Sequence, residues 1–269
     1  MGRRVAILLD ARSREAFLRG HAPGAAHLPF SEWSARAAEL PPREEPVDIV
    51  AETPRDAARI AADLVARGFP HARAADAPRL DDRSESGLAR AIAWRPASAL
   101  PRCAPLLPAR GRALDVACGA GRDVAWLAAR GLDTIGLDVL PDALARARLL
   151  GHAAEELAEG APMRPRARTA FVCADAAETP FMDGGFDLVT GFRYLERALF
   201  PRALFWLRPG GHILWQTFST RTPADRHPRR ASFRLAPGEL AKLCSDAGFR
   251  VLEAWEDGVQ DGVLARREA

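Results

Sequence analysis

The sequence predicts an α/β protein with two domains, of which the second is built on a mainly parallel, doubly wound sheet. Two observations lead to this prediction. Short apolar runs alternate regularly with amphipathic helical patterns along the chain. In addition, 269 residues with 48% hydrophobic content provide enough material for one or two domains with sizeable cores.

Charge and cysteine content narrow the class of protein. The net charge is +3, and arginines alternate with acids along most of the chain, with Lys242 the single lysine. This pattern is typical of solvated surface, so we expect no nucleic-acid partner. The four cysteines lie far apart without any Cys-x-x-Cys spacing, which favours neither zinc nor disulfides and fits a reducing cytoplasm. The apolar run at 5–9 is too short for a signal peptide or a membrane span, so we expect a cytoplasmic protein.

Residues 1–80 are expected to form a small α/β domain, since strand and helix patterns alternate there. The expected elements are a buried strand at 5–9, a short helix at 13–18, a second strand at 47–50 and an amphipathic helix at 55–67. Residues 81–109 are rich in proline and alanine, and we predict a linker there with one helical piece at 87–94.

Residues 110–269 are expected to form the second domain. The expected strands are 112–117, 134–137, 170–174, 186–190 and 212–218. The expected helices are 123–130, 141–157, 195–207 and 237–247. Two terminal strands at 249–255 and 259–266 could pair as an antiparallel hairpin at one edge. In open sheets of this kind, ligands bind beyond the carboxyl ends of the strands.

A glycine turn after the first of these strands is the most informative stretch. Gly119 and Gly121 separate the strand from a helix start, and glycine lets a ligand approach bare backbone. Three acids, Asp115, Asp138 and Asp175, lie at the carboxyl ends of expected strands or in the turns beside them. Asp138 lies 19 residues beyond Gly119, a spacing suited to a ribose diol.

A dinucleotide site is the competing interpretation of this turn. Such a site requires a third glycine where this chain has Val124, and Asp115 and Asp123 would place negative charge beside a pyrophosphate. The acids therefore favour a cationic ligand that carries a nucleoside.

Five ordered motifs resemble those of class I S-adenosylmethionine-dependent methyltransferases, namely 114–121, Asp138, 173–176, 186–192 and 207–211. The resemblance implies a Rossmann-like domain with a mainly parallel seven-stranded sheet, and S-adenosyl-L-methionine as cofactor. It implies cofactor contacts from Asp115, Ala117, Cys118, Gly119, Gly121, Asp138, Val139, Asp175, Ala176, Thr190 and Phe192. A narrower resemblance, to small-molecule methyltransferases of the tellurite-resistance type, rests on 121–123 and 194–197.

The methyl acceptor implied by this resemblance is a small molecule, and no metal is expected. Tyr194 and Arg193 follow the fourth strand and are the candidate catalytic residues. Tyr194 could orient an acceptor or could equally be a core aromatic. A dedicated base is optional when the acceptor is a soft anion, because alignment alone supplies roughly 7–11 kcal/mol. Cys118 is interpreted as a small turn residue and not as a nucleophile.

The first domain resembles the opening of a rhodanese domain, on the evidence of 9–12, Phe17, 20–21, 23–25 and Pro29. In that family a Cys-x-x-Gly-x-Arg loop follows the second strand and holds a persulfide. The matching positions here are Ala51, Pro54 and Asp56, so the nucleophile is missing. Asp10, Arg12 and His21 are interpreted as structural turn and ion-pair residues.

Three functions remain open at this point. The first is a methyltransferase, the second is a regulatory module that binds S-adenosylmethionine without turnover, and the third is sulfur transfer, against which Ala51 argues. The sequence leaves the acceptor, the oligomeric state and the reason for joining the two domains undetermined.

Overall fold

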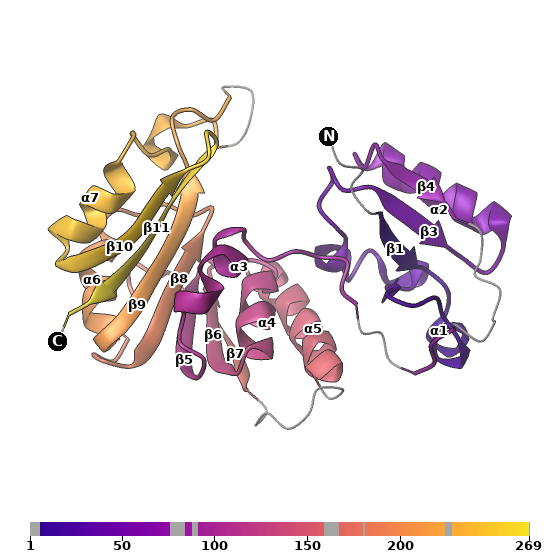
Figure 1. The fold of residues 1–269 in the computed structure, drawn as a ribbon, viewed down its shortest axis with the longest axis horizontal. Coiled ribbons are helices and arrows are strands. Elements are labelled where there is room, and N and C mark those ends of the chain that lie inside the picture. The colour runs from indigo at the N-terminus through magenta and orange to yellow at the C-terminus, as the bar shows by residue number, and fades with distance from the viewer. Residues whose placement is uncertain are drawn as a thin grey trace. The chain divides into compact units, whose positions relative to one another are not determined.

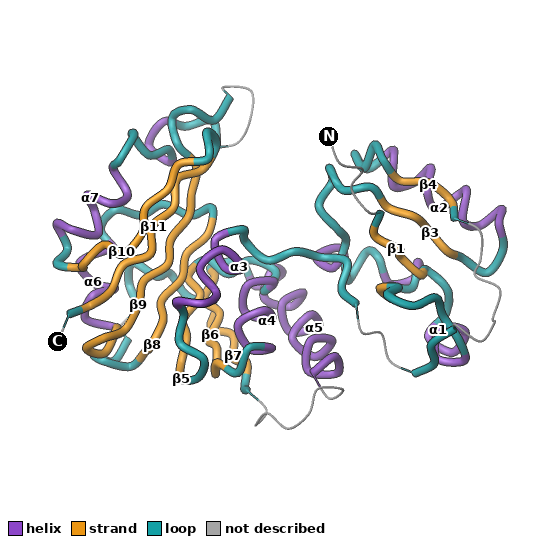
Figure 2. Tube along the Cα trace, viewed as in Figure 1, coloured by secondary structure: helices purple, strands orange, loops and turns teal. Residues whose placement is uncertain are grey.

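The computed structural model describes residues 6–75, 84–87, 91–158, 167–179, 181–223 and 228–268, with the backbone alone for 151–158. The chain divides into two compact units, the first built on residues 1–95 and the second on 96–151 and 163–269. Both are mixed α/β units (Figures 1 and 2). Within the described residues, no helix is both long enough and apolar enough to cross a bilayer.

The described part of the first unit contains a four-stranded parallel sheet in the order β2-β1-β3-β4. Its elements are β1 (Ile7–Asp10), α1 (Arg14–Arg19), β2 (Ala26–His27), β3 (Val47–Val50), α2 (Pro54–Ala66) and β4 (Ala72–Ala74), with short 3-10 turns at Phe30–Glu32 and Ala37–Glu39. Alternating buried positions on β1 and β3 pack against α2, whose inward face carries Ile60 and Leu64. The two strands and two helices predicted for this domain are therefore present.

The described part of the second unit contains a seven-stranded sheet in the order β10-β11-β9-β8-β5-β6-β7. Its strands are β5 (Gly111–Val116), β6 (Leu132–Asp138), β7 (Thr169–Cys173), β8 (Phe186–Phe192), β9 (Leu207–Phe218), β10 (Phe249–Glu256) and β11 (Gln260–Arg267). Only β11 runs antiparallel to its neighbours, and it lies between β9 and β10. Strand order reverses at β5, which has β6 on one side and β8 on the other, so the switch point for ligand binding lies at its carboxyl end.

Helices cover both faces of this sheet (Figure 1). The helices are α3 (Ala99–Cys103), α4 (Arg122–Ala129), α5 (Pro141–Ala158), α6 (Leu199–Trp206) and α7 (Glu239–Asp246), with 3-10 turns at Ala104–Leu106 and Ala231–Phe233. One face packs α3 and α4 over Ala113, Leu188 and Leu214. The other packs α6 and α7 over Val189, Ile213 and Trp215. Two apolar layers thus fix the central strands, which makes the predicted doubly wound architecture correct.

The start of α6 differs from the prediction. The sequence predicts a helix from residue 195, but α6 begins at Leu199. The carbonyl oxygen of Tyr194 accepts a hydrogen bond from the indole Nε1 of Trp215 at 2.8 Å, and the backbone N–H of Ala198 donates to the side chain of Glu196 at 3.2 Å. These contacts occupy groups that an earlier helical turn would need.

The Pro209-Gly210-Gly211 stretch of the 207–211 motif lies inside β9. The pairing of β8 with β9 shifts register there, because Phe186 faces Leu207 while Leu188 faces His212. Gly210 has φ 81°, a left-handed conformation that glycine adopts without strain. The Pro-Gly-Gly stretch is therefore a bulge within a continuous strand.

The segment predicted as a linker is divided between the two units. No helix forms at the described residues of 87–94; Ala91 instead makes an isolated bridge to Ala26 in the first unit, while residues 88–90 lie outside the described residues. Residues 99–107 pack in the second unit, because Leu100 and Cys103 are fully buried against its sheet.

Gly191 offers a test of this packing. It lies opposite Trp215 in the β8–β9 pair, and a Cβ at Gly191 would come within 2.3 Å of the indole. Gly191→Ala should therefore reduce the free energy of unfolding by roughly 3 kcal/mol through overpacking, measured by urea titration.

Gly258 provides the matched control. It has φ 88°, and an added Cβ would have no neighbouring atom within 4 Å, so Gly258→Ala should cost only about 1 kcal/mol through backbone strain. Equal losses in the two variants would contradict the steric role of Gly191.

Candidate functional site

The turn from β5 into α4 contains several left-handed residues. Ala117, Gly119 and Gly121 have φ of 56°, 54° and 78°. A Cβ on Gly121 would lie 2.7 Å from the Cβ of Ala147 on α5, so the turn packs closely against that helix. The backbone is thereby held in one conformation at the carboxyl edge of the sheet, where the sequence predicts a ligand cradle.

A cavity of about 290 Å³ opens beside this turn. It is lined by Asp115, Ala117, Cys118, Gly119, Ala120, Arg122, Asp123, Phe192 and Arg193. Six of the residues proposed from the sequence line it, whereas Gly121, Asp138, Val139, Asp175, Ala176, Thr190 and Tyr194 do not. The proposed residues thus divide into a group at the cavity and a group along the adjoining strand ends.

Asp115 lines the cavity and is 1% exposed. Thr190 is its register partner on β8 and donates a hydrogen bond to Oδ1 at 2.7 Å. The other oxygen, Oδ2, is buried and has no hydrogen-bond partner among the described residues. The pKa of Asp115 is raised well above its usual range, mainly by burial and secondly by the negative charge of Asp123. Thr190 therefore positions the carboxyl group, and Oδ2 remains available to a ligand.

Asp123 is a site residue that the sequence reasoning did not assign. It is 4% exposed on the first turn of α4, and its Oδ1 accepts a hydrogen bond from the backbone N–H of Ala97 at 2.6 Å. Burial raises its pKa, while the amide of Ala97 and the charges of Arg193 and Arg122 oppose that rise. Its position directly after the glycine turn is the signal that could have identified it.

Asp138 stabilises the glycine turn from the end of β6. Its Oδ2 accepts the backbone N–H of Gly119 at 2.8 Å, and its Oδ1 accepts that of Leu140 at 2.9 Å. The next residue, Val139, is 56% exposed. The carboxylate thus connects the first two βα turns, with an exposed apolar side chain beside it.

Asp175 and Ala176 follow β7. The exposed Asp175 accepts the backbone N–H of Ala177 through Oδ1 at 2.8 Å, which closes a local turn, while Ala176 is buried in the sheet core. The core residue therefore anchors the turn and leaves the acid at the surface.

Tyr194 is half-buried and packs against the core cluster that contains Trp215, with 6.3 Å between the two ring centroids. Burial and the charges of Glu196, Asp175 and Asp138 raise the pKa of its phenol, so the hydroxyl stays protonated at neutral pH. Phe192 is buried against the cluster formed with α3. Tyr194 is thus a packed residue that could donate a hydrogen bond, rather than a ready base.

Cys118 is buried between the turn and the sheet. A Cβ on Gly136 would approach its Sγ to 2.8 Å, so the sulfur fills space beside a glycine. Burial and the neighbouring acids raise the pKa of the thiol far above neutrality, which keeps it protonated and unreactive.

The rhodanese-like loop of the first unit forms the start of a helix. Thr53 accepts the backbone N–H of Asp56 at 3.1 Å and Pro54 is the first residue of α2, so these positions cap the helix. Ala51 is buried where that family has its cysteine. The loop therefore presents no thiol.

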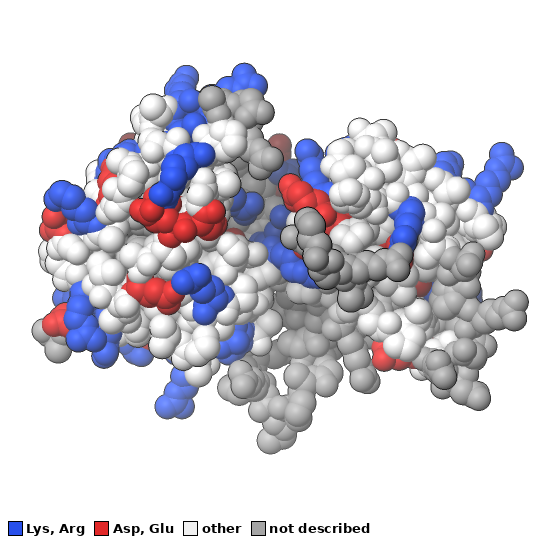
Figure 3. Space-filling view, turned by 45° about the horizontal axis from the view of Figure 1, so that its top comes forward, with Lys and Arg blue, Asp and Glu red and all other residues white. Residues whose placement is uncertain are grey.

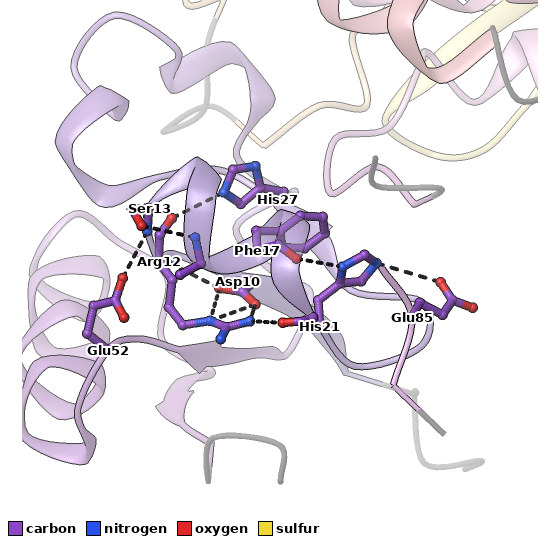
Figure 4. Close-up of polar contacts among 10 residues, drawn as sticks. Asp10, Arg12, Ser13, Phe17, His21, His27, Glu52 and Glu85 are labelled. Carbon is purple, nitrogen blue, oxygen red and sulfur yellow. Dashed lines mark hydrogen bonds and ion pairs between the residues drawn. The ribbon is translucent and has the colours of Figure 1, made fainter. Parts of the chain in front are cut away.

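Polar contacts near β1 are structural, as predicted (Figure 4). Arg12 donates to both carboxylate oxygens of Asp10 and to the carbonyl oxygen of Gly20 at 2.8 Å. His21 is buried, stacks on Phe17 and has Nδ1 3.0 Å from the carbonyl oxygen of that residue. These contacts hold the turn after α1 against the sheet.

Basic and acidic side chains lie interspersed on the face shown in Figure 3. Among the described residues of the second unit, Arg221 pairs with the exposed Glu256 and with the buried Asp261. An exposed pair such as Arg221–Glu256 contributes little to stability and is typical of solvated surface.

Comparison with known families finds a match within each unit. A family described as "Methyltransferase domain" matches residues 113–211, and one described as "Rhodanese-like domain" matches residues 1–76.

A demethylmenaquinone methyltransferase of Beutenbergia cavernae is 36% identical over 114 residues, which is 40% of this chain and 41% of the relative, so the match spans less than half of that protein. An uncharacterized protein of Schizosaccharomyces pombe is 26% identical over 94% of this chain and 90% of its own length, so that match extends over both units.

Among solved structures, a Haemonchus contortus phosphoethanolamine N-methyltransferase 2 in complex with S-adenosyl-L-methionine has the same fold as the second unit. The TM-score is 0.50 at 17% identity, over 64% of this chain and 52% of that one. The chain therefore matches a methyltransferase domain over residues 113–211 and a rhodanese-like domain over residues 1–76, and its second unit shares the Rossmann-like fold of that solved structure.

Asp115 yields a prediction on stability. Its pKa is raised in the folded state, so the folded protein binds the proton more tightly than the unfolded chain, and Asp115 destabilises the protein progressively as pH rises above about 4. Asp115→Asn removes this term while keeping an acceptor for Thr190. Without ligand, the variant should gain stability relative to wild type between pH 5 and pH 8, measured by urea unfolding.

The matched control is Asp183→Asn at an exposed acid of the same unit, which should leave the pH profile unchanged. If Asp115→Asn and wild type lose stability in parallel over this range, the assignment of a destabilising buried charge to Asp115 is wrong.

Proposed function

Because residues 113–211 match a methyltransferase domain, we propose that the protein transfers a methyl group from S-adenosylmethionine to a small-molecule acceptor at the carboxyl edge of the second sheet. The observation that supports this most directly is the buried, unpartnered Oδ2 of Asp115 in a cavity that also contains Asp123. The cavity is also lined by Arg122 and Arg193, so the preference for a positively charged group applies to the unpartnered oxygen of Asp115 and not to the cavity as a whole.

The positively charged end of the cofactor fits this cavity. A carboxyl group buried without a partner is costly, and an ammonium or sulfonium group would compensate it. We assign the amino-acid end of the cofactor to Asp115, Ala117, Cys118, Gly119 and the neighbouring backbone. The left-handed turn supports this assignment because it brings the backbone itself, free of bulky side chains, to the cavity wall.

The nucleoside end would extend along the neighbouring strand ends. We assign the ribose to Asp138 and Val139, since Asp138 already lies against Gly119 and can accept further hydrogen bonds. We assign the adenine to Asp175 and Ala176, with Gly121, Thr190 and Phe192 shaping the site from below. The exposed side chain of Val139 supplies the apolar surface that a purine or ribose face needs.

When bound, S-adenosylmethionine supplies a methyl group on a positively charged sulfur. The residues of this chain would bind and orient the cofactor and exclude water from it. Orientation of this kind lowers the activation free energy by roughly 7–11 kcal/mol. Phe192 and Ala97 belong to the apolar cluster formed with α3, which keeps this side of the site dry. Tyr194, protonated at neutral pH, is proposed to orient the acceptor by donating a hydrogen bond.

For the acceptor, the first class that we propose is a small quinol. The support is the relative named demethylmenaquinone methyltransferase, which matches 40% of this chain. A quinol hydroxyl ionises more readily than an alcohol, which suits a site whose nearest tyrosine is not a base.

Calorimetric titration with S-adenosylhomocysteine tests the cofactor assignment. Wild type should bind it, and Asp138→Ala should bind it about 10- to 100-fold more weakly, because the variant loses a charged acceptor and a support of the glycine turn. Asp183→Ala, at an exposed acid, is the control and should bind like wild type. If the folded wild-type protein fails to bind, the proposed function is wrong.

Turnover is measured separately, as the formation of S-adenosylhomocysteine in the presence of quinol, thiol and metalloid acceptors. Binding without turnover across this panel would favour the regulatory module instead. The same preparation should show no thiosulfate:cyanide sulfurtransferase activity, because Ala51 carries no thiol.

A further inference from the structure

A short exposed turn, Ala231–Phe233, lies beside the carboxyl end of β9 (Figure 1). The chain returns to the sheet at Leu235, which is fully buried and forms an isolated parallel bridge to the residue directly after β9. The backbone N–H of Leu235 donates to the carbonyl oxygen of Phe218 at 2.8 Å. Phe218 lies two residues beyond Gln216, the partner on β9 of the cavity residue Phe192. The turn is therefore anchored at the edge of the sheet where the candidate site lies.

Two arginines hold this turn in a fixed shape. Arg197 donates to the carbonyl oxygens of Ser232 at 2.7 Å and of Arg234 at 3.1 Å. Arg234 donates in its turn to the carbonyl oxygens of Thr222 at 2.8 Å and of Pro228 at 2.7 Å. Because both guanidinium groups satisfy backbone carbonyls, the turn keeps the side chains on its outer side in place.

The outer side of the turn carries an aromatic ring and two arginines. Phe233 is 46% exposed, and its backbone N–H donates to the carbonyl oxygen of Arg230 at 3.1 Å. Arg229 and Arg230 are exposed, and no hydrogen bond or ion pair joins their side chains to another described residue. An exposed ring beside free guanidinium groups is suited to a partner that has negative charge at its surface and apolar material beneath it.

The acids that contact residues 228–238 do not cancel this positive charge. Glu239 accepts the backbone N–H of Ala236 but is paired with Arg197, and Glu256 accepts that of Gly238 but is paired with an arginine at the end of β9. Residues 228–238 themselves contain three arginines and no acid. The four preceding residues, outside the described part of the chain, add one arginine and one acid. The segment thus carries a net positive charge.

We propose that residues 228–238 form a docking surface for an anionic lipid bilayer, with Phe233 at the interface and Arg229 and Arg230 against lipid phosphates. Planar guanidinium groups match phosphate oxygens, and an aromatic ring is stabilised when it moves from water to the boundary between headgroups and acyl chains. A nucleic acid would require a longer basic track than two free arginines, and it offers an exposed phenylalanine less apolar surface.

Docking at this surface would bring a bilayer to the edge of the sheet that holds the cavity. A quinol is an aromatic molecule that partitions into an apolar phase, so a membrane at this edge would supply the acceptor on the side of the methyl group. This consequence rests on the proposed function, whereas the docking surface itself rests on the charge and exposure of the turn.

Co-sedimentation with vesicles tests the docking surface. Wild type should bind vesicles of phosphatidylcholine and phosphatidylglycerol more tightly than vesicles of phosphatidylcholine alone, and salt should weaken the binding. Replacing both arginines, Arg229→Gln with Arg230→Gln, should weaken binding to the anionic vesicles by about 10- to 30-fold. Phe233→Ser should weaken it by about 5-fold, whereas Phe233→Trp should bind at least as tightly as wild type, because tryptophan favours the membrane interface.

Matched controls lie elsewhere on the same unit. Phe205→Ser removes a ring that is 55% exposed on α6, and Arg110→Gln with Arg148→Gln removes two exposed arginines. These variants should bind both kinds of vesicle like wild type. Melting temperatures and titration with S-adenosylhomocysteine show whether each variant is folded.

A loss of vesicle binding confined to the variants of the turn supports the docking surface. Failure of wild type to bind anionic vesicles overturns it, and so does binding by the turn variants that equals the controls. If wild type binds a single-stranded RNA oligonucleotide but no vesicles, and the same variants lose that binding, the turn belongs to a nucleic-acid site and the proposal is wrong.

The two proposals fail separately. A wild-type protein that binds S-adenosylhomocysteine but no vesicles refutes only the docking surface. One that binds anionic vesicles but no S-adenosylhomocysteine refutes only the proposed function.

Discussion

A carboxyl group that is buried with one oxygen unpartnered constrains the whole second unit. Asp115 lies inside the sheet, held through one oxygen by Thr190, and the charge of Asp123 makes its ionisation harder still. Such a group costs stability in any protein that does not supply a positive charge to it. The cationic ligand proposed for the topological switch point would compensate this cost.

The rest of the domain can be understood as the scaffold that holds this group in place. Leu114 and Val116, on either side of Asp115 in β5, are fully buried and pack into the core of the face covered by α6 and α7. Gly136 on β6 leaves room for the sulfur of Cys118, and Gly121 leaves room for α5. The turn can approach a ligand closely only because these positions are small. Packing directly beneath the turn thus determines the geometry at the cavity.

The sequence was most informative where a residue's role depends on its local neighbours. Apolar runs predicted every strand of the second sheet, and the signal has its clearest physical cause in central strands such as β8, which is buried along its whole length. It was less informative where a distant partner decides the outcome. The late start of α6 follows from a hydrogen bond to Trp215, which is 21 residues further along the chain than Tyr194. The role of Asp123 depends on the amide of Ala97, in a segment that composition alone assigns to a linker.

The segment from Ala97 to Ala99 illustrates the consequence of such long-range contacts. Ala97 donates to Asp123, and both Ser98 and Ala99 donate to Oε1 of Gln216 at 3.1 Å. Gln216 is 2% exposed, and its backbone carbonyl oxygen accepts a hydrogen bond from the backbone N–H of Arg193. Gln216 therefore joins the first residues of the second unit to Arg193, which lines the cavity. Since the second unit begins at residue 96, the chain enters this unit beside the candidate site itself, through backbone that the buried side chains of Asp123 and Gln216 hold in place.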